Sequence, residues 1–209
     1  ADGTVAVGYS ALAALTSGAG NVAIGYQALS AHTTGTYSLA IGSGVLQHSV
    51  DGAYNIGIGH GAMSDWDAGT TVDGSNQNVM IGVNAGGGAW TNVQSNFNVG
   101  IGNYVMDAVM DGALNNTAVG YSALSALTTG DGNVAIGYEA GNDVSTGNSN
   151  VLIGAYSGDK ITTSELIVAI GYQALSGATT EADGNTAVGY QAMDGNWTTA
   201  AHVNSVAIG

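Results

Sequence analysis

The sequence predicts an all-β protein, a β-solenoid (parallel β-roll) of about twelve 17-residue coils. Two observations predict it: the chain of 209 residues contains 35 Gly and no Pro, and a branched residue followed by Gly recurs along its whole length. Successive motif glycines are 17 residues apart in six of eleven intervals, so the longer intervals are insertions into a 17-residue coil. The motif glycines are Gly8, Gly25, Gly42, Gly59, Gly82, Gly102, Gly120, Gly137, Gly154, Gly171, Gly189 and Gly209.

Each copy begins with a strand pattern of period two. In the copy from Asn21 to Gly25, Val22 and Ile24 point to one side of the strand and Ala23 points to the other. Gly then ends the strand, because it adopts positive φ freely. Tyr-x-Ala-Leu and a polar stretch follow and return the chain to the next strand. Segments such as 10–15 would also suit a helix, but the recurring Gly disfavours a helix longer than two turns.

The repeats fill the chain, so we expect one repeat domain, 1–209, with insertions in 60–81, 83–101 and 190–208. Coils that stack about 4.8 Å apart would build a rod of roughly 50 Å. We expect this rod to be a segment of a longer fibre, since solenoid ends need caps to remain soluble alone.

The small residue between the two branched ones is Ala or Gly in ten of twelve copies. If the branched residues fill the coil, this column faces outward and predicts a self-association seam, because small residues allow another backbone to approach closely. Met80 and Leu152 would then space the partners apart. The alternative is that the column faces a thin second core layer. The expected seam residues are Ala6, Ala23, Ala40, Gly57, Gly100, Ala118, Ala135, Ala169, Ala187 and Ala207.

The Ser-Val-Ala-Ile-Gly segment at 205–209 resembles the head repeat of trimeric autotransporter adhesins of the YadA type. The longer form, Asn-Thr-Ala-Val-Gly-Tyr-Gln-Ala from Asn185, resembles repeats in phage tail-fibre shafts and large microbial surface proteins. The adhesin resemblance implies a left-handed parallel β-roll, three of which pack about a common axis. The sequence departs from the pattern in its longer coil and in Thr4 and Ile167, which replace the leading Asn.

Composition excludes several partners. The single Lys or Arg against 15 Asp and Glu gives a net charge of −14, which disfavours nucleic acid and anionic membrane surfaces. No apolar run is long enough to cross a bilayer, so we expect no membrane insertion. The absence of Cys excludes disulfides and Cys-based metal sites.

We expect no catalytic residues, no cofactor site and no metal site. The four His fall at different phases of the repeat, and the nearby His48, Ser49 and Asp51 are a chance cluster. Seven Asp-Gly dipeptides are typical of tight turns, although carboxylates on adjacent coils could loosely hold Ca²⁺. Of these, Asp2, Asp131 and Asp183 share one phase.

The insertions are the best candidates for ligand contact, because all three Trp lie in them. An aromatic ring flanked by carboxylates is suited to stack on a sugar and bond its hydroxyls, so we expect glycan contact there. The alternative is that each Trp packs its own loop against the rod. The expected contact residues are Asp65, Trp66, Asp67, Trp90 and Trp197.

Six Tyr directly follow a motif glycine, and we expect them to form a stiffening ladder of stacked rings. They are Tyr9, Tyr26, Tyr121, Tyr138, Tyr172 and Tyr190.

The sequence thus favours a non-enzymatic structural or adhesive fibre segment whose partners are copies of itself and host cell-surface glycan. The foremost setting is a virion, as a phage tail-fibre shaft or receptor-binding fibre. The alternatives are a bacterial surface adhesin and a subunit of a self-assembling extracellular filament. Ice binding would need regular Thr-x-Thr columns, and a depolymerase would need carboxylates gathered in a cleft.

Overall fold

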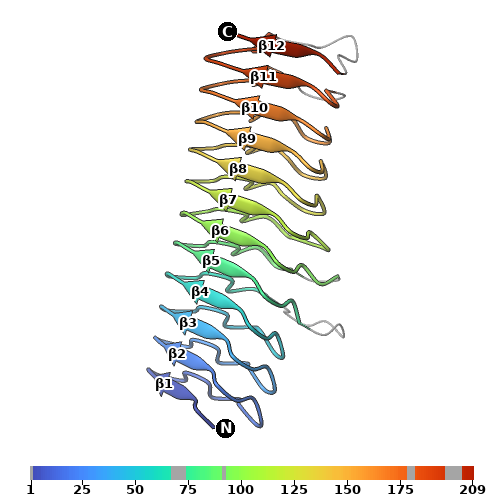
Figure 1. The fold of residues 1–209 in the computed structure, drawn as a ribbon. Coiled ribbons are helices and arrows are strands. Elements are labelled where there is room, and N and C mark those ends of the chain that lie inside the picture. The colour runs from blue at the N-terminus through green and yellow to red at the C-terminus, as the bar shows by residue number, and fades with distance from the viewer. Residues whose placement is uncertain (1, 67–73, 91–92, 178–181, 196–203) are drawn as a thin grey trace.

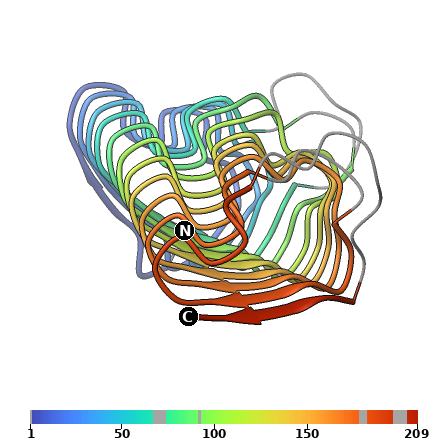
Figure 2. The same ribbon diagram turned by 90° about the horizontal axis from the view of Figure 1, so that it is seen from above.

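The chain folds as a β-solenoid whose twelve short strands form one parallel sheet in chain order (Figure 1). The computed structural model describes residues 2–66, 74–90, 93–177, 182–195 and 204–209. The predicted fold class is confirmed, and the sheet forms one side of the cross-section when the rod is viewed along its axis (Figure 2). The described ranges contain no helix, and hence none long and apolar enough to cross a membrane.

Each strand is the three-residue segment that precedes a motif glycine, and equivalent residues pair along the rod, as Ala23 does with Ala6 and with Ala40. The strands are β1 (Val5–Val7), β2 (Val22–Ile24), β3 (Leu39–Ile41), β4 (Ile56–Ile58), β5 (Val79–Ile81), β6 (Val99–Ile101), β7 (Thr117–Val119), β8 (Val134–Ile136), β9 (Val151–Ile153), β10 (Val168–Ile170), β11 (Thr186–Val188) and β12 (Val206–Ile208).

The motif glycine is required for two reasons, which Gly25 illustrates. Its φ of 139° lies in a region that other residues rarely adopt. A Cβ at this position would also overlap the carbonyl oxygen of Gly42 in the next coil. The column of motif glycines therefore lets successive coils approach closely at the corner where each strand ends.

A ladder of buried asparagines holds the opposite corner, where each strand begins. The backbone N–H of Asn133 donates to Oδ1 of Asn116 at 2.9 Å, and its Nδ2 donates to the same oxygen at 3.0 Å. Nδ2 also donates to the carbonyl of Gly147 at 2.8 Å. The same set of bonds repeats without interruption from Asn55 to Asn150, so every polar atom of these buried amides is satisfied.

The ladder is weaker or broken where another residue replaces Asn. At Ser38 the hydroxyl accepts from the Asn55 N–H at 3.3 Å and donates to the Gly52 carbonyl at 3.4 Å. The equivalent bonds of the asparagines are shorter, 2.9–3.1 Å to the backbone N–H and 2.8–2.9 Å to the carbonyl. At Ile167 the backbone N–H still donates to Oδ1 of Asn150 at 3.0 Å, but the apolar side chain has no acceptor to offer to the next coil. The corner therefore accommodates Ser or Ile in single coils between asparagines.

The small column of each strand faces the interior, which corrects the expectation that it faces outward. Ala23 and Ala135 are fully buried within a single chain, whereas Ile24 and Ile136, beside them on the same strands, are exposed. The alternative of a thin second core layer is therefore the right one. The whole predicted seam column is turned inward, and it is buried except in the first and last coils, at Ala6, Ala23, Ala40, Gly57, Gly100, Ala118, Ala135, Ala169, Ala187 and Ala207.

The interior is one side chain thick, so a large residue in this column requires small residues across from it. Leu152 is buried, and a Cβ added to Gly141 or Gly158 would lie 2.6 or 2.7 Å from its methyl groups. Met80 is buried in the same way and lies against Gly86 and Gly100. Met80 and Leu152 therefore fill space that glycines leave inside the coil and do not space partner chains apart.

Candidate functional site

The outward branched side chains of β1–β12 form one continuous apolar surface, which we call the Val/Ile face. No residue on this side of any strand is buried, and the exposed fractions are 40% at Ile136 and 41% at Ile101 in the middle of the rod and reach 78% at Ile208 in the last strand. Of its positions only Thr117 and Thr186 are polar, and none is charged. These branched residues were expected to fill the core. The structure instead buries the predicted seam column and exposes its branched neighbours on the same strands.

The dimensions of the Val/Ile face make it a candidate interaction surface. Three-residue strands are about 10 Å long and eleven coil spacings span about 50 Å, so the face covers about 500 Å². That area lies toward the upper end of the roughly 300–600 Å² of the largest apolar patch on a typical monomer. Lone exposed Val or Ile residues are ordinary, whereas a contiguous apolar patch of this size is often functional, which makes the Val/Ile face a candidate interaction surface.

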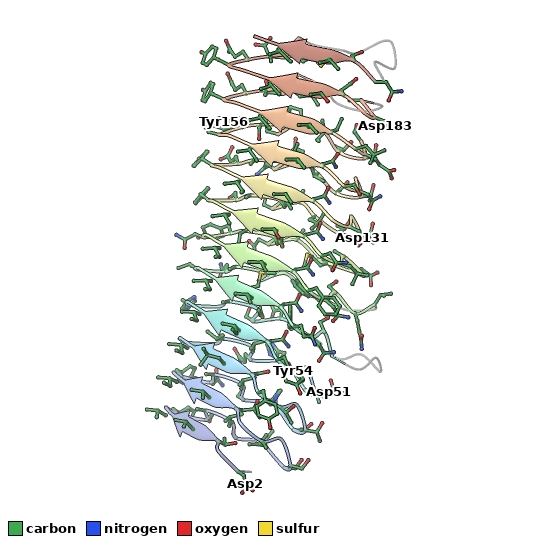
Figure 3. The ribbon with its side chains drawn as sticks, in the orientation of Figure 1. Asp2, Asp51, Tyr54, Asp131, Tyr156 and Asp183 are labelled. Atoms are coloured by element: carbon green, nitrogen blue, oxygen red, sulfur yellow. The ribbon has the colours of Figure 1, made fainter. Side chains whose placement is uncertain are left out.

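Tyrosines line the edge of this face where the strands end, at the side where Figure 3 labels Tyr156. The predicted ladder is present in part: Tyr9 stacks on Tyr26, Tyr121 on Tyr138, and Tyr172 on Tyr190, with ring centroids 5.2–5.5 Å apart. Two further tyrosines, Tyr104 and Tyr156, were not predicted for the ladder. Each lies two residues after its motif glycine instead of one, and its ring packs edge-on against the neighbouring ladder rings. In both coils the position directly after the motif glycine holds a residue other than Tyr. A Tyr one residue later was the sequence signal that could have predicted these two ladder members.

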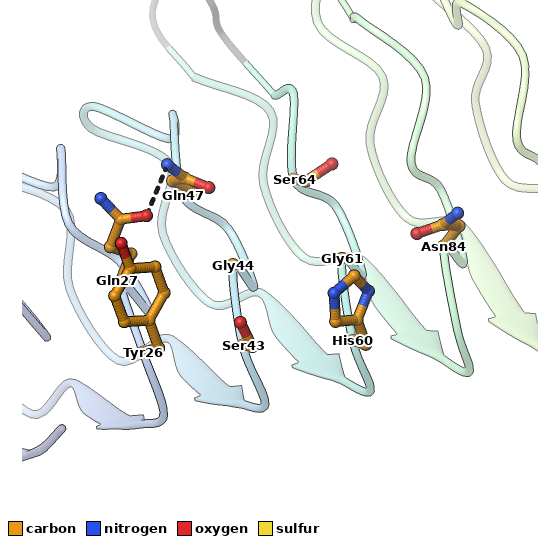
Figure 4. A pocket seen from close by; sticks show the side chains of 9 residues that line it. All are labelled: Tyr26, Gln27, Ser43, Gly44, Gln47, His60, Gly61, Ser64 and Asn84. Carbon is orange, nitrogen blue, oxygen red and sulfur yellow. Dashed lines mark hydrogen bonds between the residues drawn. The ribbon is translucent and has the colours of Figure 1, made fainter. Parts of the chain in front are cut away.

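The ladder is interrupted between Tyr26 and Tyr104. The corresponding positions of the intervening coils hold Ser43, His60 and Val83. A shallow cavity of about 190 Å³ opens at this interruption, lined by Tyr26, Gln27, Ser43, Gly44, Gln47, His60, Gly61, Ser64 and Asn84 (Figure 4).

The two described tryptophans are interior residues, which overturns the expected glycan contact at Trp66 and Trp90. Trp66 is fully buried and Trp90 is 2% exposed, and their ring centroids are 4.0 Å apart. They fill the wider interior of the long coils, so neither ring is open to a sugar. Asp65 is half exposed and lies 3.1 Å from Nδ1 of His48. Asp67 and Trp197 lie outside the described residues.

The cluster of His48, Ser49 and Asp51 has no triad geometry. The Ser49 side chain is buried, and Nδ1 of His48 lies 2.8 Å from the Ser64 carbonyl oxygen. The carboxylate of Asp51 instead accepts the Gly74 N–H from the next coil at 2.8 Å. These residues therefore hold neighbouring coils together.

Other aspartates serve the same purpose. Asp2, Asp131 and Asp183 lie along the edge where the strands begin (Figure 3), and Asp131 and Asp183 accept backbone N–H groups of preceding coils at 2.7 and 2.9 Å. Among the described residues, no three His, Cys, Asp or Glu side chains are arranged to hold a metal ion. Loose binding of Ca²⁺ was not tested by these contacts and stays a prediction.

Lys160 is the only basic residue other than His. Its Nζ lies 3.6 Å from Asp143 and 3.8 Å from Asp159. Burial raises the pKa of Asp159, and the charge of Lys160 partly offsets that rise. This group is an electrostatic contact between adjacent coils at the surface of the rod.

Comparison of the chain with protein-family models, with curated proteins and with solved structures gave no match.

Proposed function

We propose that this chain is a segment of a structural fibre, the shaft of a virion tail fibre, in which three copies pack lengthwise through their Val/Ile faces. The observation that carries the proposal is the uncharged, β-branched sheet surface that runs through all twelve strands. The repeat's resemblance to phage tail-fibre shafts supports the virion setting, and its resemblance to trimeric adhesin heads supports the number three.

A second copy of the chain is the partner that this surface suits best. The Val/Ile face repeats with every strand spacing along the rod, about 4.8 Å, and a surface that matches it throughout needs the same spacing. A copy of the chain supplies that spacing over its full length. The Tyr column widens the apolar area toward the roughly 800 Å² that each partner buries in a stable interface.

The distribution of charge also favours this mode of packing. Chains with a net charge of −14 repel one another, but no carboxylate lies on the Val/Ile face. Asp131 and Asp183 lie at the edge of the sheet where the strands begin and bond to their own rod. Copies that meet through the branched side chains therefore keep these carboxylates out of the contact.

The test is the mass of the particle in solution and its response to one charge on the face. We expect light scattering with size exclusion to give three times the 20.5 kDa chain mass for the wild type. Ile136→Lys puts an ammonium group at the centre of the face and should give monomers with an unchanged circular dichroism spectrum, because the exposed side chain can extend into water.

Ala126→Lys is the matched control. It adds the same charge at the phase where Lys160 occurs naturally, and Asp143 occupies that phase in the next coil. This variant should keep the wild-type mass. A monomeric wild type, or an Ile136→Lys variant with unchanged mass, would overturn the proposal, and a particle of two chains would refute the trimer.

A further inference from the structure

We propose that the cavity at the interruption of the Tyr ladder binds a single pyranose ring. It spans four successive coils, with Tyr26 at one end and Asn84 at the other (Figure 4). The cavity exists because Ser43 replaces the tyrosine that would stack on Tyr26, and because Gly44 and Gly61 have no side chains at the next position.

Tyr26 is the apolar platform of this site. Tyr26 is 53% exposed, and its ring stacks on Tyr9 in the preceding coil, 5.5 Å between centroids. Among the described residues no ring stacks on it from the following coil, unlike Tyr138, which has ring neighbours on both sides. An aromatic ring that is supported on one side and open on the other presents a fixed apolar surface for the C–H groups of a sugar.

The polar groups of the cavity are uncharged amides and hydroxyls together with one imidazole. Nε2 of Gln47 donates to Oε1 of Gln27 at 3.3 Å, which fixes the two amides relative to each other. Within the described part of the chain, the side chains of Ser43, His60 and Asn84 have no protein hydrogen-bond partner, so they can bond to a ligand. Together these groups supply both donors and acceptors.

This composition selects the ligand class. No carboxylate and no Lys lines the cavity, in a chain with 15 acidic residues, so the site offers little to a metal ion or a phosphate. A neutral ring with many hydroxyls matches an aromatic platform surrounded by amides. The volume of about 190 Å³ is below the roughly 300–1,000 Å³ of clefts for drug-sized ligands, which limits the occupant to one ring.

The inference does not depend on trimer formation, because every lining residue comes from one chain. A shallow site for one ring predicts millimolar affinity, so several sites on a fibre would act together on a cell-surface glycan. A monomeric variant such as Ile136→Lys should therefore bind a simple glycoside as well as the wild type does, per chain.

Saturation-transfer NMR with the methyl glycosides of glucose, galactose, mannose and N-acetylglucosamine tests the site. We expect transfer to at least one of them, and binding about tenfold weaker in Tyr26→Ala. Ser43→Tyr restores the ladder residue and fills the cavity, so it should abolish the transfer while the fold is retained. A glycan array read with the wild type and Ser43→Tyr then distinguishes a surface polysaccharide from a free monosaccharide as the natural source.

Tyr172→Ala is the control, because it removes a ladder tyrosine at the same phase far from the cavity. It should bind each glycoside like the wild type. Absence of transfer from all four glycosides would overturn the inference. Transfer that persists in Ser43→Tyr, or that falls equally in Tyr172→Ala, would also overturn it.

Discussion

Two stretches of the rod differ in coil length but keep the same corner. Between β7 and β10 every coil has 17 residues, whereas the coils from β4 to β5 and from β5 to β6 have 23 and 20. The Asn bond between successive coils is nevertheless the same: 3.0 Å from Asn78 N–H to Asn55 Oδ1 in the long coils and 2.9 Å from Asn133 N–H to Asn116 Oδ1 in the regular ones.

The comparison shows that the Asn corner and the strand set the register, and that extra residues are accommodated elsewhere. The interior changes to match. At the phase where the regular coils bury Leu127, Val144 and Ile161, the first long coil buries Trp66. All five Met lie in intervals longer than 17 residues, and their flexible side chains can fill irregular space. Length can therefore change at one part of a coil without a shift in strand pairing.

The largest effect is expected from Trp66→Ala, which removes the filling of the long coils. It should lower the free energy of unfolding by about 3–5 kcal/mol. Because each coil contacts only its neighbours, the loss should be concentrated around β4–β6. Hydrogen exchange read by mass spectrometry gives the location. Leu127→Ala, at the same phase of a regular coil, should raise exchange around β7–β8 instead. Unchanged exchange in β4–β6 of Trp66→Ala would contradict this assignment.

Asn133→Leu tests the corner that both stretches share. It leaves the Gly147 carbonyl without its side-chain donor and the Asn150 N–H without its acceptor, so we expect a loss of about 3 kcal/mol. The reverse change, Ile167→Asn, places an amide between Asn150 and Asn185 and should alter stability by less than about 1 kcal/mol. Denaturant unfolding of the two variants measures both values. Equal losses would show that the bonds of the Asn ladder do not stabilise this corner.

The smallest expected effect is a pH dependence of stability caused by His32. This residue lies seven positions after its motif glycine, where Leu127 lies in a later coil. Burial lowers the pKa of His32 below the ordinary histidine value of 6.5. Below pH 6.5 the unfolded chain therefore binds a proton at His32 more readily than the folded chain does. The free energy of unfolding should keep its full value above pH 6.5 and fall as the pH drops below it, by at most about 1.4 kcal/mol per pH unit. His32→Leu should remove this dependence between pH 7 and about 5.5, where most carboxylates stay ionised. If denaturation midpoints of His32→Leu still fall over that range, His32 is not the group responsible.

The period, the strands and the motif glycines could be predicted because they depend on local geometry. A strand of Val-Ala-Ile followed by Gly has one conformation that repeats every coil, and the structure confirms it. The side that faces inward could not be read from the same pattern, since alternation indicates two sides without naming the buried one. The sizes of the residues do indicate the buried side: where the column holds the large Leu152 or Met80, Gly occupies positions across the interior.

The backbone conformation of the turns after each strand could not be predicted from the sequence pattern either. Gln27 and Leu29 adopt φ of 54° and 51°, a conformation that costs non-glycine residues roughly 1–2 kcal/mol each. Nothing in Tyr-x-Ala-Leu indicates it, because the contacts that compensate for it come from other coils. The buried Asn was visible as eight of twelve residues at one phase, but polar residues before a strand are usually exposed. The prediction of exposed Trp side chains at Trp66 and Trp90 was wrong because burial depends on the width of the coil, which the local sequence does not indicate.

The in-register Asn ladder makes the length of this rod easy to change by recombination. Deleting residues 117–133 would join Asn116 directly to β8, and the resulting Asn-Val-Ala-Ile segment would meet the same phase of its new neighbours. Duplicating that segment would add one coil in the same way. Unequal exchange between repeats of the gene can therefore lengthen or shorten the protein in steps of about 4.8 Å without a new contact type. A lineage could adjust the reach of such a fibre before it alters any of the fibre's surfaces.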